Sequence, residues 1–434
     1  MHAKSAASLF LLALASPLAA QTVAPPQTWI HAGRLIDRPG QPVRGPSTIV
    51  VENGRIVAVR DGIVAPDRAD ARVIDLTGKT VLPGLIDSHV HLTSDTGGIA
   101  GQLEEITLSP AAQAFNAPVN GMKTLRAGFT TVRNLGDGDG ATLALRDAVL
   151  AGKAIGPRII DAGNSISGTS GHMDGSLGYR DELRPMLDGA GNTCNGAEDC
   201  RRATRLQIAR GADVIKFAST GGVNSRIGAG LGRQMFDDEA KAIVETAHMF
   251  GKKVAVHAHG ADSIALAIAA GADSIEHGTI LTPELVSQWA KAKTYYVPTL
   301  STVNGYRERL AANPNAYAPD VLEKIKWRIA ITGQSLRTLV PRGVRIAYGT
   351  DSGVAKHDRN ADEFELMVAN GMPPASALVA ATTNAADLLG LASEIGLIEQ
   401  GKSADLIAVT GDPLADVTVL KRVEFVMARG RVIE

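Results

Sequence analysis

The sequence lacks the charge patterns that mark several classes of protein. Its 434 residues include 44 Lys and Arg against 45 Asp and Glu, so the formal net charge is -1. A nucleic-acid-binding domain would carry a basic surplus or dense Lys/Arg runs, and a disordered chain would combine low hydrophobicity with lopsided charge. Neither class fits, because 45% of the residues are hydrophobic and 21% are charged, as in ordinary globular proteins.

Aromatic residues and cysteines are also scarce. Aromatic residues make up 4% of the chain, whereas 46 residues are glycine, which favours an aliphatic core with many tight turns over an aromatic-rich binding surface. The only cysteines are Cys194 and Cys200. In an exported chain an isolated close pair predicts a disulfide that closes a small loop. The alternative, a metal site, needs further soft ligands, and the neighbouring sequence has none.

The most pronounced apolar run lies near residue 1. Residues 1–20 give a short basic start, an apolar stretch from Ala6 to Ala15 and then small residues, which is the order of a secretory signal peptide. The run is too short to span a bilayer. We expect cleavage after Ala20 or Ala24, and a periplasmic or secreted protein without membrane contact after the signal is removed. The alternative is a short buried helix.

Both ends of the remaining chain have the composition of a β-sheet. Near the first end, extended apolar segments flank Asn53-Gly54, which is a strong hairpin signal. The last segments of the chain show the same alternation of apolar and polar residues. We therefore expect one small β-sandwich domain assembled from residues 21–82 and 391–434.

Between these ends, short apolar strands alternate with helical stretches. The expected strands are residues 84–91, 129–133, 158–162, 213–219, 253–257, 272–277, 294–298 and 344–350. Strands that alternate with helices predict an α/β fold with a parallel sheet, and eight such units predict a (β/α)8 barrel over residues 83–390. A doubly wound open sheet is the alternative.

Polar residues fall at the ends of the expected strands. Two positions apart on one strand, His89 and His91 point to the same side and can share a metal. Lys216 lies in an apolar strand, where an unpaired ammonium is costly to bury. Further strand ends carry His257, His259, His277 and Asp351. In a barrel the carboxyl ends of the strands converge on one mouth, where active sites lie.

Taken together, these motifs resemble the amidohydrolase superfamily. The residues that carry the resemblance are 84–91 (GLIDSHVH), the strand lysine Lys216, His257, His277 and 349–353 (GTDSG). The closer resemblance is to the imidazolonepropionase-like branch, which includes Xaa-Pro dipeptidases, Lys/Arg carboxypeptidase-type enzymes and ochratoxinases. It covers essentially all of the mature chain, including the expected β-sandwich.

The resemblance implies a site for two divalent metal ions, usually zinc, although histidine and carboxylate ligands also suit Mn or Co. The implied ligands are His89, His91 and Asp351 for one metal, His257 and His277 for the other, and Lys216 as the bridge. The bridging lysine would be N6-carboxylated by CO2, which reacts with a neutral amine and therefore with a lysine of depressed pKa. The alternative is a lysine that extends as a free ammonium to the barrel mouth.

The resemblance also implies roles in catalysis. Two metals would lower the pKa of a bridging water and polarise the scissile carbonyl. Asp351 would take the proton of this water and return it to the leaving nitrogen. His259 would contact the substrate and donate a hydrogen bond to the tetrahedral oxyanion. His172, in a glycine-rich loop, would hold the substrate α-carboxylate unless it is simply a solvent-exposed histidine, and His357 is a candidate substrate contact at the rim.

The expected function is that of a binuclear metal-dependent amidohydrolase, a peptidase-like or carboxypeptidase-like enzyme that cleaves an amide next to a free carboxylate. Expected substrates are dipeptides such as Xaa-Pro, N-acyl amino acids and ochratoxin-type amides. One alternative is a cyclic-amide hydrolase of imidazolonepropionase type, against which Lys216 argues because the mononuclear members lack a bridging lysine. Another is a non-catalytic ligand-binding barrel. The family further implies a homo-oligomer, for example an octamer.

Overall fold

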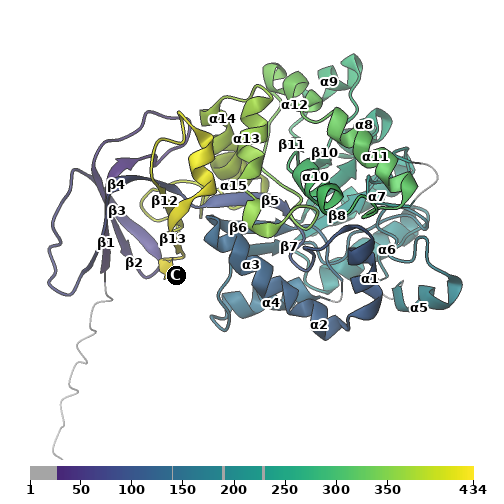
Figure 1. The fold of residues 1–434 in the computed structure, drawn as a ribbon, viewed down its shortest axis with the longest axis horizontal. Coiled ribbons are helices and arrows are strands. Elements are labelled where there is room, and N and C mark those ends of the chain that lie inside the picture. Colours follow the sequence, from purple (N-terminus) through teal and green to yellow (C-terminus); the bar gives the residue numbers. More distant parts are fainter. Residues whose placement is uncertain (1–26, 139, 188–190, 227–229) are drawn as a thin grey trace, which may run out of the picture.

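The computed structural model describes residues 27–138, 140–187, 191–226 and 230–434. The expected signal peptide at residues 1–20, with both candidate cleavage sites, lies outside these ranges. Figure 1 shows a sheet on one side of the molecule and, on the other side, strands that are surrounded by helices. Within the described ranges, no helix has the length and apolar character needed to cross a membrane.

The sheet on one side is built from both ends of the chain. Its strands are β1 (Gln27–Leu35), β2 (Ser47–Glu52), β3 (Arg55–Asp61), β4 (Arg72–Pro83), β12 (Leu406–Val409), β13 (Val423–Ala428) and β14 (Arg431–Ile433). Their order is β14-β13-β12-β4-β1-β2-β3. The two segments expected to form a β-sandwich share one continuous sheet, in which β4 is 12 residues long and pairs with β1 along one part and with β12 along another.

Local sequence explains the hairpin and the core of this sheet. Asn53 and Gly54 adopt φ angles of 52° and 74°, the left-handed conformation that a tight turn between β2 and β3 requires. Alternate residues of the strands point to one side and form a separate apolar cluster. Because Ile30 and Ile49 from the early strands share this cluster with Leu406 and Met427 from the late strands, the two ends of the chain bury each other's apolar surface.

Parallel strands occupy the middle of the chain. One sheet contains β5 (Leu85–Val90), β6 (Phe129–Asn134) and β7 (Arg158–Asp161), and another contains β8 (Val214–Ala218), β9 (Lys253–Ala258), β10 (Ser274–His277) and β11 (Tyr295–Val297). These seven strands coincide with seven of the eight expected ones. The structure therefore confirms a mixed α/β fold with parallel strands in its central part.

The eighth expected strand, residues 344–350, is not a regular strand. The segment is hydrogen-bonded on both sides, because Tyr348 O accepts from Ser88 N and Ala347 N donates to Tyr296 O. These bonds occur at isolated positions, and only the single bridge between Tyr296 and Ile346 joins the segment to β11. Since the two parallel sheets are not closed into one continuous ladder, the (β/α)8 barrel stays a prediction.

Helices connect the parallel strands and cover them (Figure 1). They are α1 (Gly98–Thr107), α2 (Pro110–Ala114), α3 (Asn116–Arg126), α4 (Ala141–Leu150), α5 (Arg184–Leu187), α6 (Ala197–Ala209), α7 (Asp237–Met249), α8 (Ala261–Ala270), α9 (Pro283–Trp289), α10 (Thr302–Ala312), α11 (Pro319–Ala330), α12 (Gln334–Leu339), α13 (Asp362–Ala369), α14 (Pro374–Val379) and α15 (Ala385–Leu388). Sequence signals mark their ends: Gly271 ends α8 with φ 90°, and the Thr282 side chain caps α9 ahead of Pro283. The largest apolar cluster joins strand residues such as Val256 and Ile275 to Ile243 and Ile264 of α7 and α8.

A disulfide joins Cys194 to Cys200, whose Cα atoms lie 4.9 Å apart. Both side chains are fully buried. Cys200 belongs to the first turn of α6, and Cys194 N donates a hydrogen bond to Ser167 O at 2.9 Å. The disulfide, together with this hydrogen bond, therefore ties the beginning of α6 to the segment that follows β7.

Removal of this disulfide should destabilise the fold. In the double variant Cys194→Ala/Cys200→Ala, we expect the free energy of unfolding to fall by about 2 kcal/mol, because the unfolded chain regains the freedom of the loop. Denaturant titration followed by circular dichroism would measure this change. Wild-type protein treated with a reductant serves as the matched control and should lose a similar amount. An unchanged unfolding midpoint in the double variant would contradict the expectation.

Candidate metal centre

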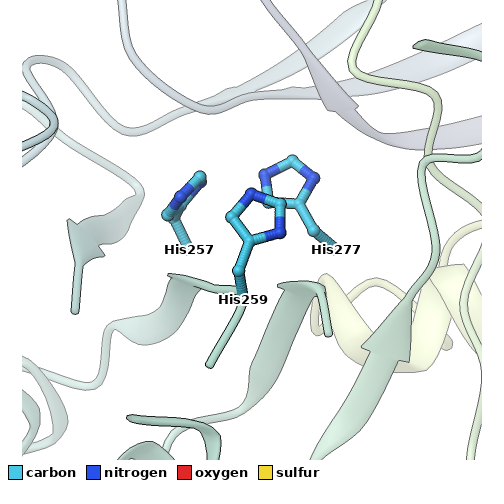
Figure 2. Close-up of side chains that lie close together, drawn as sticks. All are labelled: His257, His259 and His277. Atoms are coloured by element: carbon cyan, nitrogen blue, oxygen red, sulfur yellow. The ribbon is translucent and has the colours of Figure 1, made fainter. Parts of the chain in front are cut away.

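Three histidines form a compact buried group at the carboxyl ends of β9 and β10 (Figure 2). The ring centroid of His257 lies 4.6 Å from that of His277 and 4.8 Å from that of His259. One nitrogen from each ring can be chosen so that all three lie within 4.8 Å of one another. His259, for which the resemblance implied a substrate contact, therefore lies in the same group as the two expected ligands.

Hydroxyl groups hold two of these rings in place. The Nδ1 atom of His277 lies 2.7 Å from Thr299 Oγ1, and the Nδ1 atom of His259 lies 2.7 Å from Thr279 Oγ1. Because Nδ1 is engaged in each ring, Nε2 is the nitrogen left to interact with a ligand. His277 also has a φ angle of 71°, a conformation that costs of order 1 kcal/mol or more for a non-glycine residue and that clusters at functional sites.

A second group contains a carboxylate. Asp351 Oδ1 lies 3.4 Å from His89 Nε2 and 3.3 Å from His91 Nε2. His89, His277 and Asp351 offer ligand atoms that lie within 4.8 Å of one another, so His277 is shared with the first group. Asp351 adopts a φ angle of 59°, which follows from the sharp turn after residue 350. The structure thus brings together the expected ligands from both halves of the site.

The orientation of His89 depends on a buried ion pair. The His89 Nδ1–H donates to Glu276 Oε2 at 2.8 Å, and Arg133 Nη2 donates to Glu276 Oε1 at 2.8 Å. All three side chains are at most 1% exposed. Burial alone would raise the pKa of Glu276, but the charge of Arg133 and the hydrogen bond from His89 lower it to about 2. The carboxylate therefore fixes the His89 tautomer that leaves Nε2 free for a metal.

Arg133 and Glu276 were not among the site residues expected from the sequence. Each is a charged residue at an inner position of a fully buried strand, β6 or β10, and a charge inside an expected strand is the signal that could have drawn attention to them. Their partnership depends on the folded structure, because they are 143 residues apart in the chain.

Asp87 connects β5 to the turn that carries Asp351. Its carboxylate accepts hydrogen bonds from Thr350 Oγ1 at 2.6 Å, from Asn360 Nδ2 at 2.8 Å and from His89 N at 3.1 Å. Burial raises the pKa of Asp87 to about 6, although these donors act in the opposite direction. Asp87, the aspartate of the GLIDSHVH motif, therefore fixes the backbone of His89 and the turn that carries Asp351.

Lys216 lies in the middle of β8, two residues before the end of the strand. It is 1% exposed, and its Nζ has no hydrogen-bond partner among the described residues. Burial lowers the pKa of Lys216 to about 8, which raises the fraction of neutral amine near neutrality. A buried amine without a partner, surrounded by imidazole and carboxylate donors, fits a site for divalent metal ions.

Two further histidines were expected to contact substrate. His172 lies beside the cluster, with its ring centroid 4.3 Å from that of His257 and its Nδ1 without a partner among the described residues. His357 is fully buried instead of lying at the rim. Its Nε2 lies 3.0 Å from His91 O and 2.9 Å from Ser94 O, so this ring supports the backbone next to a metal-ligand candidate. The rim position expected for His357 is therefore corrected, because both of its ring nitrogens are engaged inside the protein.

A buried set of histidine, carboxylate and lysine side chains at the ends of parallel strands defines the class of metal-dependent hydrolases. The comparison with known families agrees, because residues 80–433 match the amidohydrolase family. The chain belongs to the amidohydrolase family. The resemblance derived from the sequence motifs is therefore confirmed.

Individual relatives agree with this assignment. The chain is 31% identical to ochratoxinase from Aspergillus niger over 410 residues, which cover 91% of this chain and 83% of that protein. It is 25% identical to imidazolonepropionase from Symbiobacterium thermophilum over 426 residues, covering 88% and 90% of the two chains. The crystal structure of a Xaa-Pro dipeptidase with methionine bound in its active site superposes with a TM-score of 0.88 at 38% identity, covering 94% and 100%.

The family and these relatives define the protein as a hydrolase that acts on carbon–nitrogen bonds. Amidohydrolases generally bind divalent metals, and the histidine cluster can hold a metal. The chain is therefore a metal-dependent amide hydrolase that acts on small-molecule substrates.

The ion pair behind His89 should control metal affinity. We expect Glu276→Gln to weaken metal binding by about 10–100-fold, because the amide removes the charge that orients the His89 ring and leaves Arg133 without a counterion. Competition with a chromophoric chelator would measure the affinity. Glu245→Gln, at an exposed position of α7, is the matched control and should bind metal like the wild type. Equal affinities in all three proteins would show that Glu276 does not orient the ligand.

Proposed function

We propose that the protein is a binuclear metallohydrolase that cleaves an amide bond next to a free carboxylate. The observation that carries this proposal is the buried Lys216 amine, which has no hydrogen-bond partner in the described part of the chain and accompanies two groups of ligand atoms that share His277. A lysine carboxylated at N6 would supply two oxygen ligands and would replace a costly buried cation with an anion. The proposed ligands are His89, His91 and Asp351 for one metal, His257 and His277 for the other, and Lys216 as the bridge.

When bound, two divalent ions, with zinc as the proposed metal, supply Lewis-acid polarisation of the amide carbonyl and lower the pKa of the attacking water. Asp351 is placed to receive the proton. Burial alone would raise its pKa, but the neighbouring His89 and His91 lower it to about 2, so the carboxylate is ionised at neutral pH. The same carboxylate then returns the proton to the leaving nitrogen.

His259 and His172 have complementary proposed roles. Burial lowers the pKa of His259 well below its usual range, so the ring is neutral at pH 7. Because the Thr279 hydroxyl can donate to its Nδ1, Nε2–H is available to donate to the developing oxyanion. Burial likewise lowers the pKa of His172 to about 3. Its neutral ring is proposed to hydrogen-bond the substrate α-carboxylate.

Relatives support the proposed substrate class. Ochratoxinase and a Xaa-Pro dipeptidase are among the similar proteins, and the dipeptidase structure holds methionine, a free amino acid, in its active site. We therefore propose dipeptides such as Xaa-Pro, N-acyl amino acids or ochratoxin-type amides as substrates. The imidazolonepropionase relative favours a cyclic amide as a second candidate, against which Lys216 argues because the mononuclear members lack a bridging lysine.

We also propose that the protein is exported and forms a homo-oligomer. The signal-peptide pattern of residues 1–20 and the Cys194–Cys200 disulfide both suit an oxidising compartment, such as the periplasm or the extracellular medium. The family implies a homo-oligomer. N-terminal sequencing of the processed protein and light scattering after gel filtration would test these two expectations.

The lysine bridge provides the decisive test of the proposed site. We expect Lys216→Ala to lose activity to background and to lose bound metal, because the bridging oxygens disappear. The exposed Lys241→Ala on α7 is the control and should behave like the wild type. Metal content would be measured by mass spectrometry. Activity would be followed by chromatography on a panel of dipeptides and N-acyl amino acids, with and without a chelator.

Two results would contradict the proposal. If Lys216→Ala kept both its metal content and its activity, the lysine would not bridge a binuclear centre. If the metal-loaded wild-type protein released no amino acid from the whole panel, the proposed substrate class would be wrong even though the family assignment holds.

A further inference from the structure

Arg328 of α11 is a buried cation that has no carboxylate partner among the residues described by the structure. Among the described residues, Arg133 and Arg328 are the arginines that are buried, at 1% and 3% exposure. Arg133 pairs with Glu276, whereas no carboxylate oxygen in the described part of the chain lies within 4.0 Å of the Arg328 guanidinium nitrogens. Burying a charge without a counterion costs free energy, which makes Arg328 a candidate for a functional role.

The protein satisfies only one end of this guanidinium. Arg328 Nη2 donates to Thr299 O at 3.2 Å and to Pro298 O at 3.5 Å. The Nε–H and Nη1–H donors have no acceptor in the described structure, but neither nitrogen is among the fully enclosed polar atoms that lack a partner. These donors therefore retain some accessible surface, through which an incoming ligand can reach them.

Arg328 faces the candidate metal centre. Its Nη2 donates to the carbonyl of Thr299, and the hydroxyl of the same threonine lies 2.7 Å from Nδ1 of His277. The preceding residue, Trp327, packs edge-on against His259 with a centroid separation of 6.4 Å.

We propose that Arg328 binds the free carboxylate of the substrate and thereby selects amides of amino acids. This inference rests on the proposed function and names the residue that recognises its carboxylate. A guanidinium binds a carboxylate through charge-assisted hydrogen bonds. The Nε–H and Nη1–H groups of Arg328 remain to donate such bonds, from different edges of the guanidinium plane. The substrate carboxylate would also provide a counterion for Arg328. This charged contact differs from the neutral hydrogen bond that is proposed for His172.

The competing explanation is structural. By holding the carbonyl of Thr299, Arg328 could orient the hydroxyl that contacts His277. A structural role predicts equal losses on all substrates and a change in metal content. A carboxylate-binding role predicts losses only on substrates that carry the carboxylate.

The test compares a dipeptide or N-acyl amino acid that the wild type cleaves with its C-terminal carboxamide. For Arg328→Met, we expect kcat/KM on the free acid to fall by about 100-fold, mainly through KM, and kcat/KM on the carboxamide to change less than about threefold. Arg328→Lys should recover part of the loss, because it restores the positive charge without the donor geometry of the guanidinium. The exposed Arg307→Met on α10 is the control and should match the wild type.

Binding and metal measurements complete the test. Calorimetric titration with the free amino acid product should show about 100-fold weaker binding to Arg328→Met at unchanged metal content. Equal losses on the acid and the carboxamide, or loss of metal, would overturn the inference in favour of the structural role. Unchanged kinetics on the acid would overturn it outright. If Arg328→Met does not fold, the acid-to-carboxamide ratio of Arg328→Lys decides in the same way.

These outcomes remain separate from a failure of the proposed function. If the wild type cleaves carboxamides as well as it cleaves free acids, the proposed requirement for a carboxylate is wrong, whatever the variants do. If the wild type requires the acid and Arg328→Met keeps that requirement, only the assignment of Arg328 fails.

Discussion

The buried pair of Arg133 and Glu276 is the interaction on which the geometry of the site depends. Two opposite charges are kept at zero or near-zero exposure because each provides the other's counterion, and the second carboxylate oxygen is then free to accept from His89. Pairs of this kind contribute little net stability, since desolvation offsets their attraction. Here the pair fixes the orientation of the His89 ring. The packing that brings side chains of β5 and β6 against β10 of the other parallel sheet therefore also determines the direction of a candidate metal ligand.

The site combines several arrangements that cost free energy. Within the described parts of the chain, Lys216 is buried without a hydrogen-bond partner and Arg328 is buried without a carboxylate, while His277 and Asp351 have left-handed backbones. Such features persist where the surrounding structure over-determines them, and they gather at functional sites. In the proposed function, the first two become less unfavourable once ligands arrive: the amine as part of a metal bridge and the guanidinium with an anion. In this proposal, the protein without ligands already has the side chains that a metal ion and a carboxylate would contact.

The sequence predicted which side chains lie close together where this depends only on position along a strand. His89, His91, His257, His277 and Asp351 come together as expected, because parallel strands end at a common edge. Sequence reasoning did not find Glu276 or Arg133, since their partnership requires knowledge of how strands of two different sheets face one another. It misplaced His357, because closeness in sequence to residue 351 does not reveal that the ring is held inside the protein by the segment that follows β5. It also expected a regular strand at residues 344–350, where hydrogen bonds to two neighbours occur only at isolated positions.

The sheet that unites both ends of the chain has a consequence for how the protein reaches its native state. β4 pairs with β12 and is separated by a single residue from β5, which carries His89. The early strands thus remain without one of their neighbours until the last part of the chain has been made, and such long-range pairing is slow because a large loop must be closed. A chain cut short before β12 would expose an unpaired edge of β4, which invites aggregation. The segment that leads into the candidate metal centre therefore gains its full set of neighbours only when β12 has joined the sheet.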